Sequence, residues 1–173
     1  VGQTATKTAR VVKRAVGGVF IIDEAYSLMG DNFGQEATNT ILPMLLDYKG
    51  KMVCIAAGYP REIRQWIDTN SGLESRFTKV IHFEDYNPDE LAQIFRMKAK
   101  KDKLTLTPEA ENAMRVYFTD LYNRRERNFA NAREVNNYFD RVKKNQSSRL
   151  RHEMERPDFD PASYSILLPE DMG

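Results

Sequence analysis

Cysteine, net charge and long apolar runs are what this sequence lacks or nearly lacks. A single cysteine, Cys54, excludes an intramolecular disulfide and most cysteine-based metal sites. The 26 Lys and Arg residues almost cancel the 25 Asp and Glu residues, and the net charge of +1 gives no reason to expect a nucleic-acid partner. No apolar run is long enough to cross a bilayer, and no signal-peptide pattern opens the chain. We therefore expect a cytoplasmic protein without a membrane partner.

The composition that remains is typical of a folded protein. Hydrophobic residues make up 41% of the 173 residues and charged residues 29%, close to the average of globular domains. This length suits one domain or two small ones. The chain begins at Val1 rather than at a methionine, and we expect it to be a piece of a longer protein.

The first half of the sequence alternates helix and strand patterns. Residues 19–22 are four consecutive apolar residues, three of them β-branched, which predicts a strand covered on both faces as in a parallel sheet. Residues 52–57 predict a second strand and residues 80–83 a short third one. Apolar residues at helical spacing predict helices over residues 4–16, 35–48 and 61–69. This alternation indicates an α/β fold with a parallel sheet.

The second half carries helix signals. Asn87-Pro88-Asp89-Glu90 and Thr107-Pro108-Glu109 each place a capping residue before a proline, which is the pattern that starts a helix. Apolar residues at helical spacing predict a third helix from about residue 135 to residue 154. No strand signal appears in this half before residues 163–168. The boundary between the two patterns lies near residue 86.

Asp23 and Glu24 end the first predicted strand. The carboxyl ends of strands in an open α/β sheet face the crevice in which ligands bind. Two adjacent carboxylates there repel each other unless a cation or a proton is shared. Asp23 suits a ligand of hydrated Mg²⁺ beside nucleotide phosphates, and Glu24 suits the base that orients and deprotonates a water. The alternative is an ordinary strand-to-loop transition, in which these residue types are common.

Three further side chains pose similar choices. Tyr59 follows the strand at 52–57 at the same edge, where it either contacts a phosphate or packs over a turn. Arg76 is either an arginine finger aimed at a neighbouring subunit's phosphates or a solvated side chain beside a turn. Arg133 starts a helix of the second half, and it either closes onto phosphate held by the first half or stays in solvent.

The ordered set of motifs resembles a known family. The motifs are GQTATKT at residues 2–8, GGVFIIDEAY at 17–26, GQEA at 34–37, AGY at 57–59, SRF at 75–77 and NAR at 131–133. Together they resemble the AAA+ ATPase branch that contains stage V sporulation protein K and the CbbX-type Rubisco activases. The resemblance implies a partial α/β nucleotide-binding subdomain over residues 1–86 and a helical lid subdomain over residues 87–173.

The resemblance implies a role for each matching residue. Asp23 and Glu24 match the Walker B carboxylates, with Mg²⁺ held by Asp23 through water and catalysis assigned to Glu24. Tyr59 falls at the sensor-1 position, although a small polar residue is usual there. Arg76 matches the catalytic arginine finger, and Arg133 matches the nucleotide-binding arginine called sensor 2. The implied cofactors are ATP and Mg²⁺, and the implied partners are the other subunits of a homo-oligomeric, hexameric ring and a protein client.

Two family features are missing from these 173 residues. No segment matches G-x-x-x-x-G-K-[ST], the Walker A phosphate loop, so we expect negligible ATP affinity and no hydrolysis by this chain alone. Val1 and Gly2 match only the end of the pore loop that grips substrate. The family places the missing strand between those at 52–57 and 80–83. We therefore expect a sheet that is repaired by another pairing, swapped with another chain or loosened.

Three classes of function stay open on the sequence alone. The motif set favours an ATPase that remodels a protein client in a ring. The missing phosphate loop favours a nucleotide-free interaction or scaffold module derived from an AAA+ protein. A nucleic-acid-acting relative, such as a clamp-loader subunit, is disfavoured by the near-zero net charge.

Overall fold

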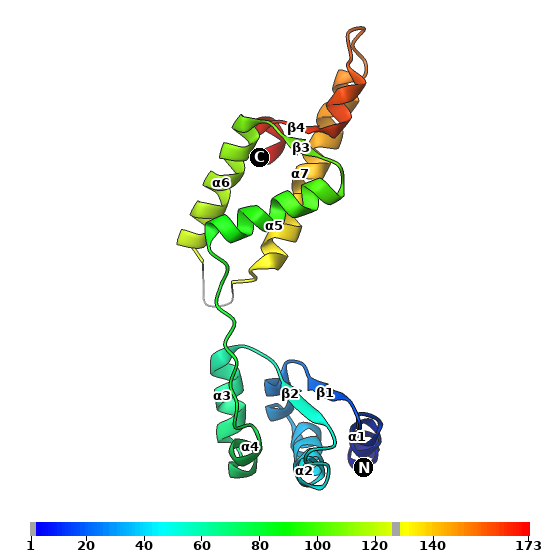
Figure 1. The fold of residues 1–173 in the computed structure, drawn as a ribbon, viewed down its shortest axis with the longest axis vertical. Coiled ribbons are helices and arrows are strands. Elements are labelled where there is room, and N and C mark those ends of the chain that lie inside the picture. The colour runs from blue at the N-terminus through cyan, green and yellow to red at the C-terminus, as the bar shows by residue number, and fades with distance from the viewer. Residues whose placement is uncertain (1–2, 126–128) are drawn as a thin grey trace. The chain divides into compact units, whose positions relative to one another are not determined.

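The chain is divided into two compact units, of which one ends at His82 and the other begins at Phe83 (Figure 1). The computed structural model describes residues 3–125 and 129–173. Unit 1 contains α1 (Gln3–Arg14), β1 (Val19–Ile22), the 3-10 helix η1 (Ala25–Met29), α2 (Asn32–Asp47), β2 (Val53–Ala56), α3 (Pro60–Asp68) and α4 (Ser71–Arg76). Unit 2 contains α5 (Pro88–Lys101), β3 (Thr105–Leu106), α6 (Pro108–Asn123), α7 (Ala132–Glu153), η2 (Pro161–Ser165), β4 (Ile166–Leu167) and η3 (Pro169–Met172).

A parallel pair of strands organises unit 1. Val19 of β1 lies opposite Val53 of β2, and Ile22 lies opposite Ala56. Parallel strands require a crossover connection, and α2 lies within that connection. Ile22 and Ala56 pack against an apolar cluster whose buried members are Ala25, Leu42, Trp66 and Leu73. The parallel pair and its helices confirm the predicted α/β class.

The prediction that both faces of these strands are covered is wrong. Side chains alternate between the two faces of a strand, and the apolar cluster covers one face. Large apolar side chains on the other face are exposed, namely Val19, Ile21, Val53 and Ile55. The apolar runs of β1 and β2 therefore have one open face within the described residues.

The predicted third strand at residues 80–83 is also wrong. Residues 77–87 form neither helix nor strand, and Val80, Ile81 and Phe83 are 78%, 68% and 86% exposed. A strand needs a neighbour to pair its backbone. Among the described residues of unit 1, the sheet consists of β1 and β2. The apolar character of residues 80–83 therefore does not produce a strand here.

Both predicted helix starts in unit 2 are confirmed. α5 begins at Pro88 and α6 at Pro108. The Asn87 side chain accepts the Glu90 N–H at 3.0 Å, while the Glu90 carboxylate accepts the Asn87 N–H at 2.9 Å. This reciprocal capping box satisfies two backbone donors that would otherwise lack partners. Thr107 caps α6 in the simpler way, through its hydroxyl oxygen alone.

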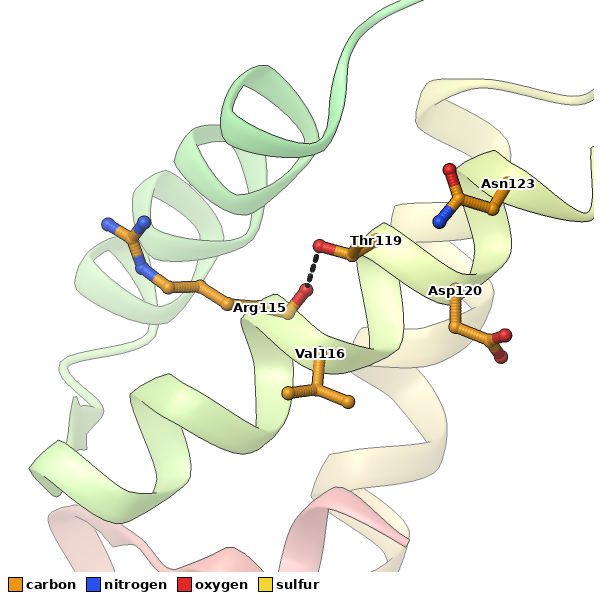
Figure 2. A pocket seen from close by; sticks show the side chains of 5 residues that line it. All are labelled: Arg115, Val116, Thr119, Asp120 and Asn123. Atoms are coloured by element: carbon orange, nitrogen blue, oxygen red, sulfur yellow. Dashed lines mark hydrogen bonds between the residues drawn. The ribbon is translucent and has the colours of Figure 1, made fainter.

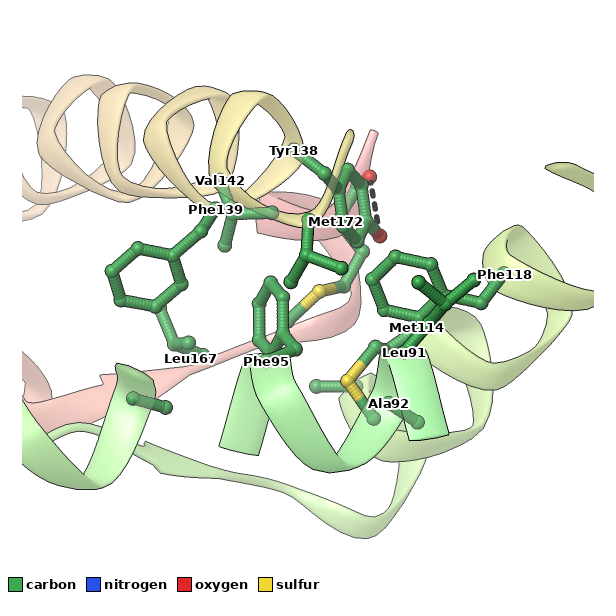
Figure 3. Close-up of a cluster of buried hydrophobic side chains, with 13 residues drawn as sticks. Leu91, Ala92, Phe95, Met114, Phe118, Tyr138, Phe139, Val142, Leu167 and Met172 are labelled. Atoms are coloured by element: carbon green, nitrogen blue, oxygen red, sulfur yellow. Dashed lines mark hydrogen bonds between the residues drawn. The ribbon is translucent and has the colours of Figure 1, made fainter. Parts of the chain in front are cut away.

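The core of unit 2 is an aromatic cluster formed by α5, α6 and α7 (Figure 3). Phe95 is fully buried, and its ring centroid lies 6.1 Å from that of Phe118, 5.5 Å from Tyr138 and 5.2 Å from Phe139. Tyr138 also stacks on Tyr117 at 3.7 Å. Burial raises the pKa of Tyr138 to about 12, because an apolar environment disfavours the charged phenolate.

The C-terminal segment is fastened to α7. The Tyr138 hydroxyl donates to the Met172 carbonyl at 3.1 Å. The Arg149 guanidinium donates through Nε and Nη2 to the two carboxylate oxygens of the fully buried Asp171, at 2.9 and 3.0 Å. A bidentate pair of this kind compensates the cost of burying the carboxylate. The segment from η2 to η3 is therefore an integral part of unit 2.

The prediction of no strand before residue 163 is wrong for one short element. β3 pairs in parallel with β4, with Thr105 opposite Ile166 and Leu106 opposite Leu167. The strand is only two residues long and its partner lies far along the chain. A local alternation pattern cannot reveal a pairing of this kind.

We predict that Phe95→Ala destabilises unit 2 by about 3–5 kcal/mol, because it leaves a cavity among three packed rings. Chemical unfolding followed by far-ultraviolet circular dichroism measures the loss. The only tryptophan, Trp66, lies in unit 1, so the midpoint of its fluorescence change should stay unchanged. Val116→Ala, at a 60% exposed site of α6, is the matched control and should cost less than about 0.5 kcal/mol. Equal effects of the two variants would contradict the assigned core.

Candidate functional site

The ends of β1 and β2 are joined by backbone hydrogen bonds. The Ala57 N–H donates to the Ile22 carbonyl at 2.9 Å, and the Ala25 N–H donates to the Ala57 carbonyl at 3.0 Å. Because the strands are parallel, their carboxyl ends meet at one edge of the sheet. The structure therefore brings Asp23 and Glu24, which follow β1, to the same edge as Tyr59, which follows β2.

Glu24 turns the chain at this edge. Its backbone has φ 49° and ψ 47°, the left-handed conformation that residues other than glycine adopt rarely. The Glu24 N–H donates to Oδ1 of Asp23 at 3.1 Å. The next residue, Ala25, is fully buried, whereas Asp23 and Glu24 are exposed. The turn therefore anchors the chain at Ala25 and leaves both carboxylates at the surface.

Tyr26 also lies at this edge of the sheet, although its motif predicts no role for it. Its ring lies 6.4 Å from that of Tyr59, centroid to centroid. It also covers Gly58 so closely that a Cβ there would come within 2.9 Å of the ring. The pKa of Tyr26 is raised, first by loss of hydration and then by the Glu24 carboxylate. The tyrosine two positions after Glu24 in the DEAY segment was the only local signal for it.

The edge suits a hydrated metal ion on its Asp23 side. One Asp23 oxygen accepts the Glu24 N–H, and the exposed second oxygen is able to bind a metal-bound water. Mg²⁺ in nucleotide sites usually keeps several waters and takes one or two carboxylates. The 173 residues supply no phosphate loop, so the fit extends to the metal and not to the cradle of a triphosphate.

Arg76 ends α4, a helix that the sequence analysis did not predict. Its Nε donates to the Leu42 carbonyl at 2.8 Å, and its Nη1 donates to the Gly72 carbonyl at 2.9 Å and the Ser75 hydroxyl at 3.0 Å. The side chain is therefore half-buried and held by α2 and α4. The interpretation of Arg76 as a merely solvated side chain is wrong.

The remaining predicted site residues belong to other parts of the chain. Arg133 belongs to unit 2, where it is an exposed residue in the first turn of α7. Val1 and Gly2, expected in the substrate pore, lie outside the described residues. A shallow hollow along α6 is lined by Arg115, Val116, Thr119, Asp120 and Asn123 (Figure 2). None of the predicted site residues lines it.

Comparison with known proteins places the chain in a family. The AAA lid domain family matches residues 87–173. Protein CbbX of Cereibacter sphaeroides is 38% identical over 176 residues, covering 99% of this chain and 56% of that protein. The chloroplastic ribulose bisphosphate carboxylase/oxygenase activase of Cyanidioschyzon merolae is 38% identical over 155 residues, covering 87% of this chain and 52% of that protein.

Another relative matches a shorter part of the chain. The ESX-1 secretion system protein EccA1 of Mycobacterium tuberculosis is 44% identical over 115 residues, covering 63% of this chain and 20% of that protein. The chain therefore belongs to the AAA+ ATPases with an AAA lid domain. Within them it belongs to the CbbX-like branch, which confirms the resemblance inferred from the motifs. It spans about half the length of the curated CbbX-like relatives that it matches.

Within residues 3–125 and 129–173, no helix combines the length and the apolar character that crossing a bilayer requires.

We predict that Gly58→Ala disturbs the edge of the sheet and destabilises unit 1 by about 1–3 kcal/mol, because the new methyl group overlaps the Tyr26 ring. Trp66 fluorescence during chemical unfolding measures the effect. Gly18→Ala is the matched control before β1, since a Cβ there meets only the Ala15 carbonyl at an ordinary 3.6 Å. A Gly58→Ala variant as stable as Gly18→Ala would show that Tyr26 does not pack as described.

Proposed function

We propose that the protein containing this chain couples ATP hydrolysis to the remodelling of a protein client in a homo-oligomeric, hexameric ring. The observation that carries the proposal is the shared edge of β1 and β2, where Asp23, Glu24 and Tyr59 come together. Membership of the AAA+ ATPases supports the ATP-dependent part. The ring and the client rest on the resemblance alone.

In this proposal, each residue at the edge has one task. Asp23 would hold Mg²⁺ through water, and the ion would supply positive charge beside the phosphates. Glu24 accepts the proton of the attacking water and orients it. Tyr59 occupies the sensor-1 position, from which its hydroxyl would contact the water or the terminal phosphate. Tyr26 supports this arrangement by packing against Gly58 and lying beside Tyr59.

Arg76 is the arginine finger in this proposal, acting on nucleotide held by the neighbouring subunit. Its hydrogen bonds to Leu42 and Gly72 restrict the guanidinium before any partner arrives. A side chain that is already ordered loses less entropy when it engages a phosphate. Val1 and Gly2 are proposed to end the pore loop that grips the client.

Arg133 is proposed to act as sensor 2, the lid residue that contacts nucleotide. Its place in the first turn of a well-packed helix supports this role, because the helix fixes its direction. For residues 1–173 alone we propose no ATP binding and no hydrolysis, since the phosphate loop is missing from this sequence.

A second candidate function is a nucleotide-free interaction or scaffold module. The missing phosphate loop favours it. The shared edge that carries Asp23 and Glu24 speaks against it, because a scaffold has no need of adjacent exposed carboxylates beside a strained backbone turn.

We predict that Glu24→Gln in the full-length protein lowers ATP turnover by at least about 100-fold while ATP binding is retained. The amide keeps the size of the side chain but cannot accept the proton. Phosphate release and nucleotide-binding calorimetry measure the two properties. Glu109→Gln, at an exposed site of α6, should hydrolyse ATP normally. A wild-type protein without hydrolysis would support the scaffold, and an active Glu24→Gln variant would refute the assigned base.

We predict that mixing Arg76→Ala with Glu24→Gln subunits restores activity that neither has alone. If Arg76 acts on the neighbouring site, random mixing completes up to about a quarter of the sites in a head-to-tail ring. Arg64→Ala, an exposed arginine of α3, serves as a control for charge loss. Trp66 fluorescence should show that Arg76→Ala remains folded despite its lost hydrogen bonds. Two inactive variants that stay inactive when mixed would refute action in trans.

A further inference from the structure

Asn131 precedes α7 in an unusual backbone conformation. Its φ is 49° and its ψ is −120°, a combination that residues other than glycine rarely adopt. Such strain costs of the order of 1–3 kcal/mol and persists only where surrounding contacts hold it. The contacts that hold Asn131 come from its own side chain.

The Asn131 carboxamide binds the segment through which the chain enters unit 2. Its Oδ1 accepts the Tyr86 N–H at 2.8 Å, and its Nδ2 donates to Oδ1 of Asp85 at 2.7 Å. The other Asp85 oxygen lies 3.7 Å from Nε of Arg125, which follows α6. Asn131 and Arg125 therefore both contact Asp85, which lies at least 40 positions earlier in the chain.

The chemistry of this contact selects asparagine. A carboxamide offers one acceptor and two donors on a short side chain. An aspartate would lose the donor and place its charge against Asp85, whereas an alanine would lose both bonds. Asparagine also tolerates positive φ better than most residues.

The same residue forms the first turn of α7. The Asn131 carbonyl accepts the Glu134 N–H at 3.0 Å, and the Ala130 carbonyl accepts the Arg133 N–H at 2.9 Å. Arg133 therefore lies within a turn whose first residue is bound to Asp85 and Tyr86. The carboxamide therefore links this turn to the entry segment.

We propose that Asn131 is a positioning residue for Arg133, which it ties to the entry segment at Asp85 and Tyr86. The inference rests on the proposed role of Arg133 toward nucleotide phosphate. Arg133 and the entry segment then move as one body, so that a displacement of residues 85–86 changes where the guanidinium lies. Loss of the carboxamide separates the two and leaves Arg133 on a helix that is still folded.

The contact itself is tested on this chain without any nucleotide. Hydrogen exchange at the Tyr86 amide should become about tenfold faster in Asn131→Ala, because its acceptor is lost. Asn131→Gly, which removes the side chain and relieves the backbone, should show the same increase. Asn136→Ala, at an exposed site of the same helix, should leave the exchange rate unchanged. An unchanged Tyr86 rate in Asn131→Ala would overturn the inference.

The positioning role is tested in the full-length protein through the ATP concentration that gives half-maximal turnover. We expect this concentration to rise about tenfold in Asn131→Ala and Asn131→Gly, with a smaller change in kcat, because binding of phosphate by Arg133 is weakened. Asn131→Asp should be at least as impaired. Combining it with Asp85→Asn should restore the KM, since the donor and the acceptor are then exchanged between the two positions.

The outcomes separate this inference from the proposed function. A wild-type protein that does not hydrolyse ATP refutes the proposed function, whereas the exchange experiment still reports on the contact. An active wild-type protein with an unchanged KM in Asn131→Ala overturns the positioning role. A wild-type KM in Asn131→Gly would also overturn it, because the backbone alone would then suffice. Failure of Asp85→Asn to rescue Asn131→Asp would show that the damage is not the lost contact.

Discussion

The candidate site depends on the parallel pairing of β1 and β2. Two backbone hydrogen bonds continue this pairing beyond the strands. The Ala57 N–H donates to the Ile22 carbonyl, and the Ala25 N–H donates to the Ala57 carbonyl. The last bond anchors Ala25, and the residue before it leaves the sheet in a left-handed turn. The exposed carboxylates of Asp23 and Glu24 are a consequence of this pairing, and so is their position beside Tyr59. An antiparallel pair would have placed the two segments at opposite ends.

Local sequence patterns predicted the helices and strands whose formation depends on neighbouring residues in the sequence. The run at residues 19–22 became β1 with the same bounds, and the prolines at 88 and 108 marked the first residues of two helices. The failures have a different cause. Residues 80–83 have strand-like composition, yet a strand forms only against a partner, and β3 finds its partner more than fifty residues later. Pairing over such a separation leaves no local signal.

The same distinction holds for the candidate site. Asp23 and Glu24 were found because two carboxylates after a buried strand form a local pattern. Tyr26 lies within the GGVFIIDEAY motif, but no role was predicted for it. Its role depends on packing against Gly58, a residue that the sheet brings near it. The side chain of Asn131 likewise forms its hydrogen bonds with Asp85 and Tyr86, about 45 positions earlier in the chain. The charged candidate residues Asp23 and Glu24 were predictable from a local pattern. Tyr26 and Asn131 were not, because their contacts are with residues distant in the sequence.

Arg76 and Arg133, the two arginines proposed to contact nucleotide, are restrained by the fold in two different ways. Arg76 is restrained directly, because two backbone carbonyls and a hydroxyl accept its N–H groups. Arg133 is exposed, and the turn that carries it is restrained instead, through the carboxamide of Asn131. Direct restraint suits a group that must present one fixed geometry to an incoming subunit. In the proposed function, restraint through the helix suits a group that moves with the lid subdomain, because the arginine side chain keeps its own freedom to reach phosphate.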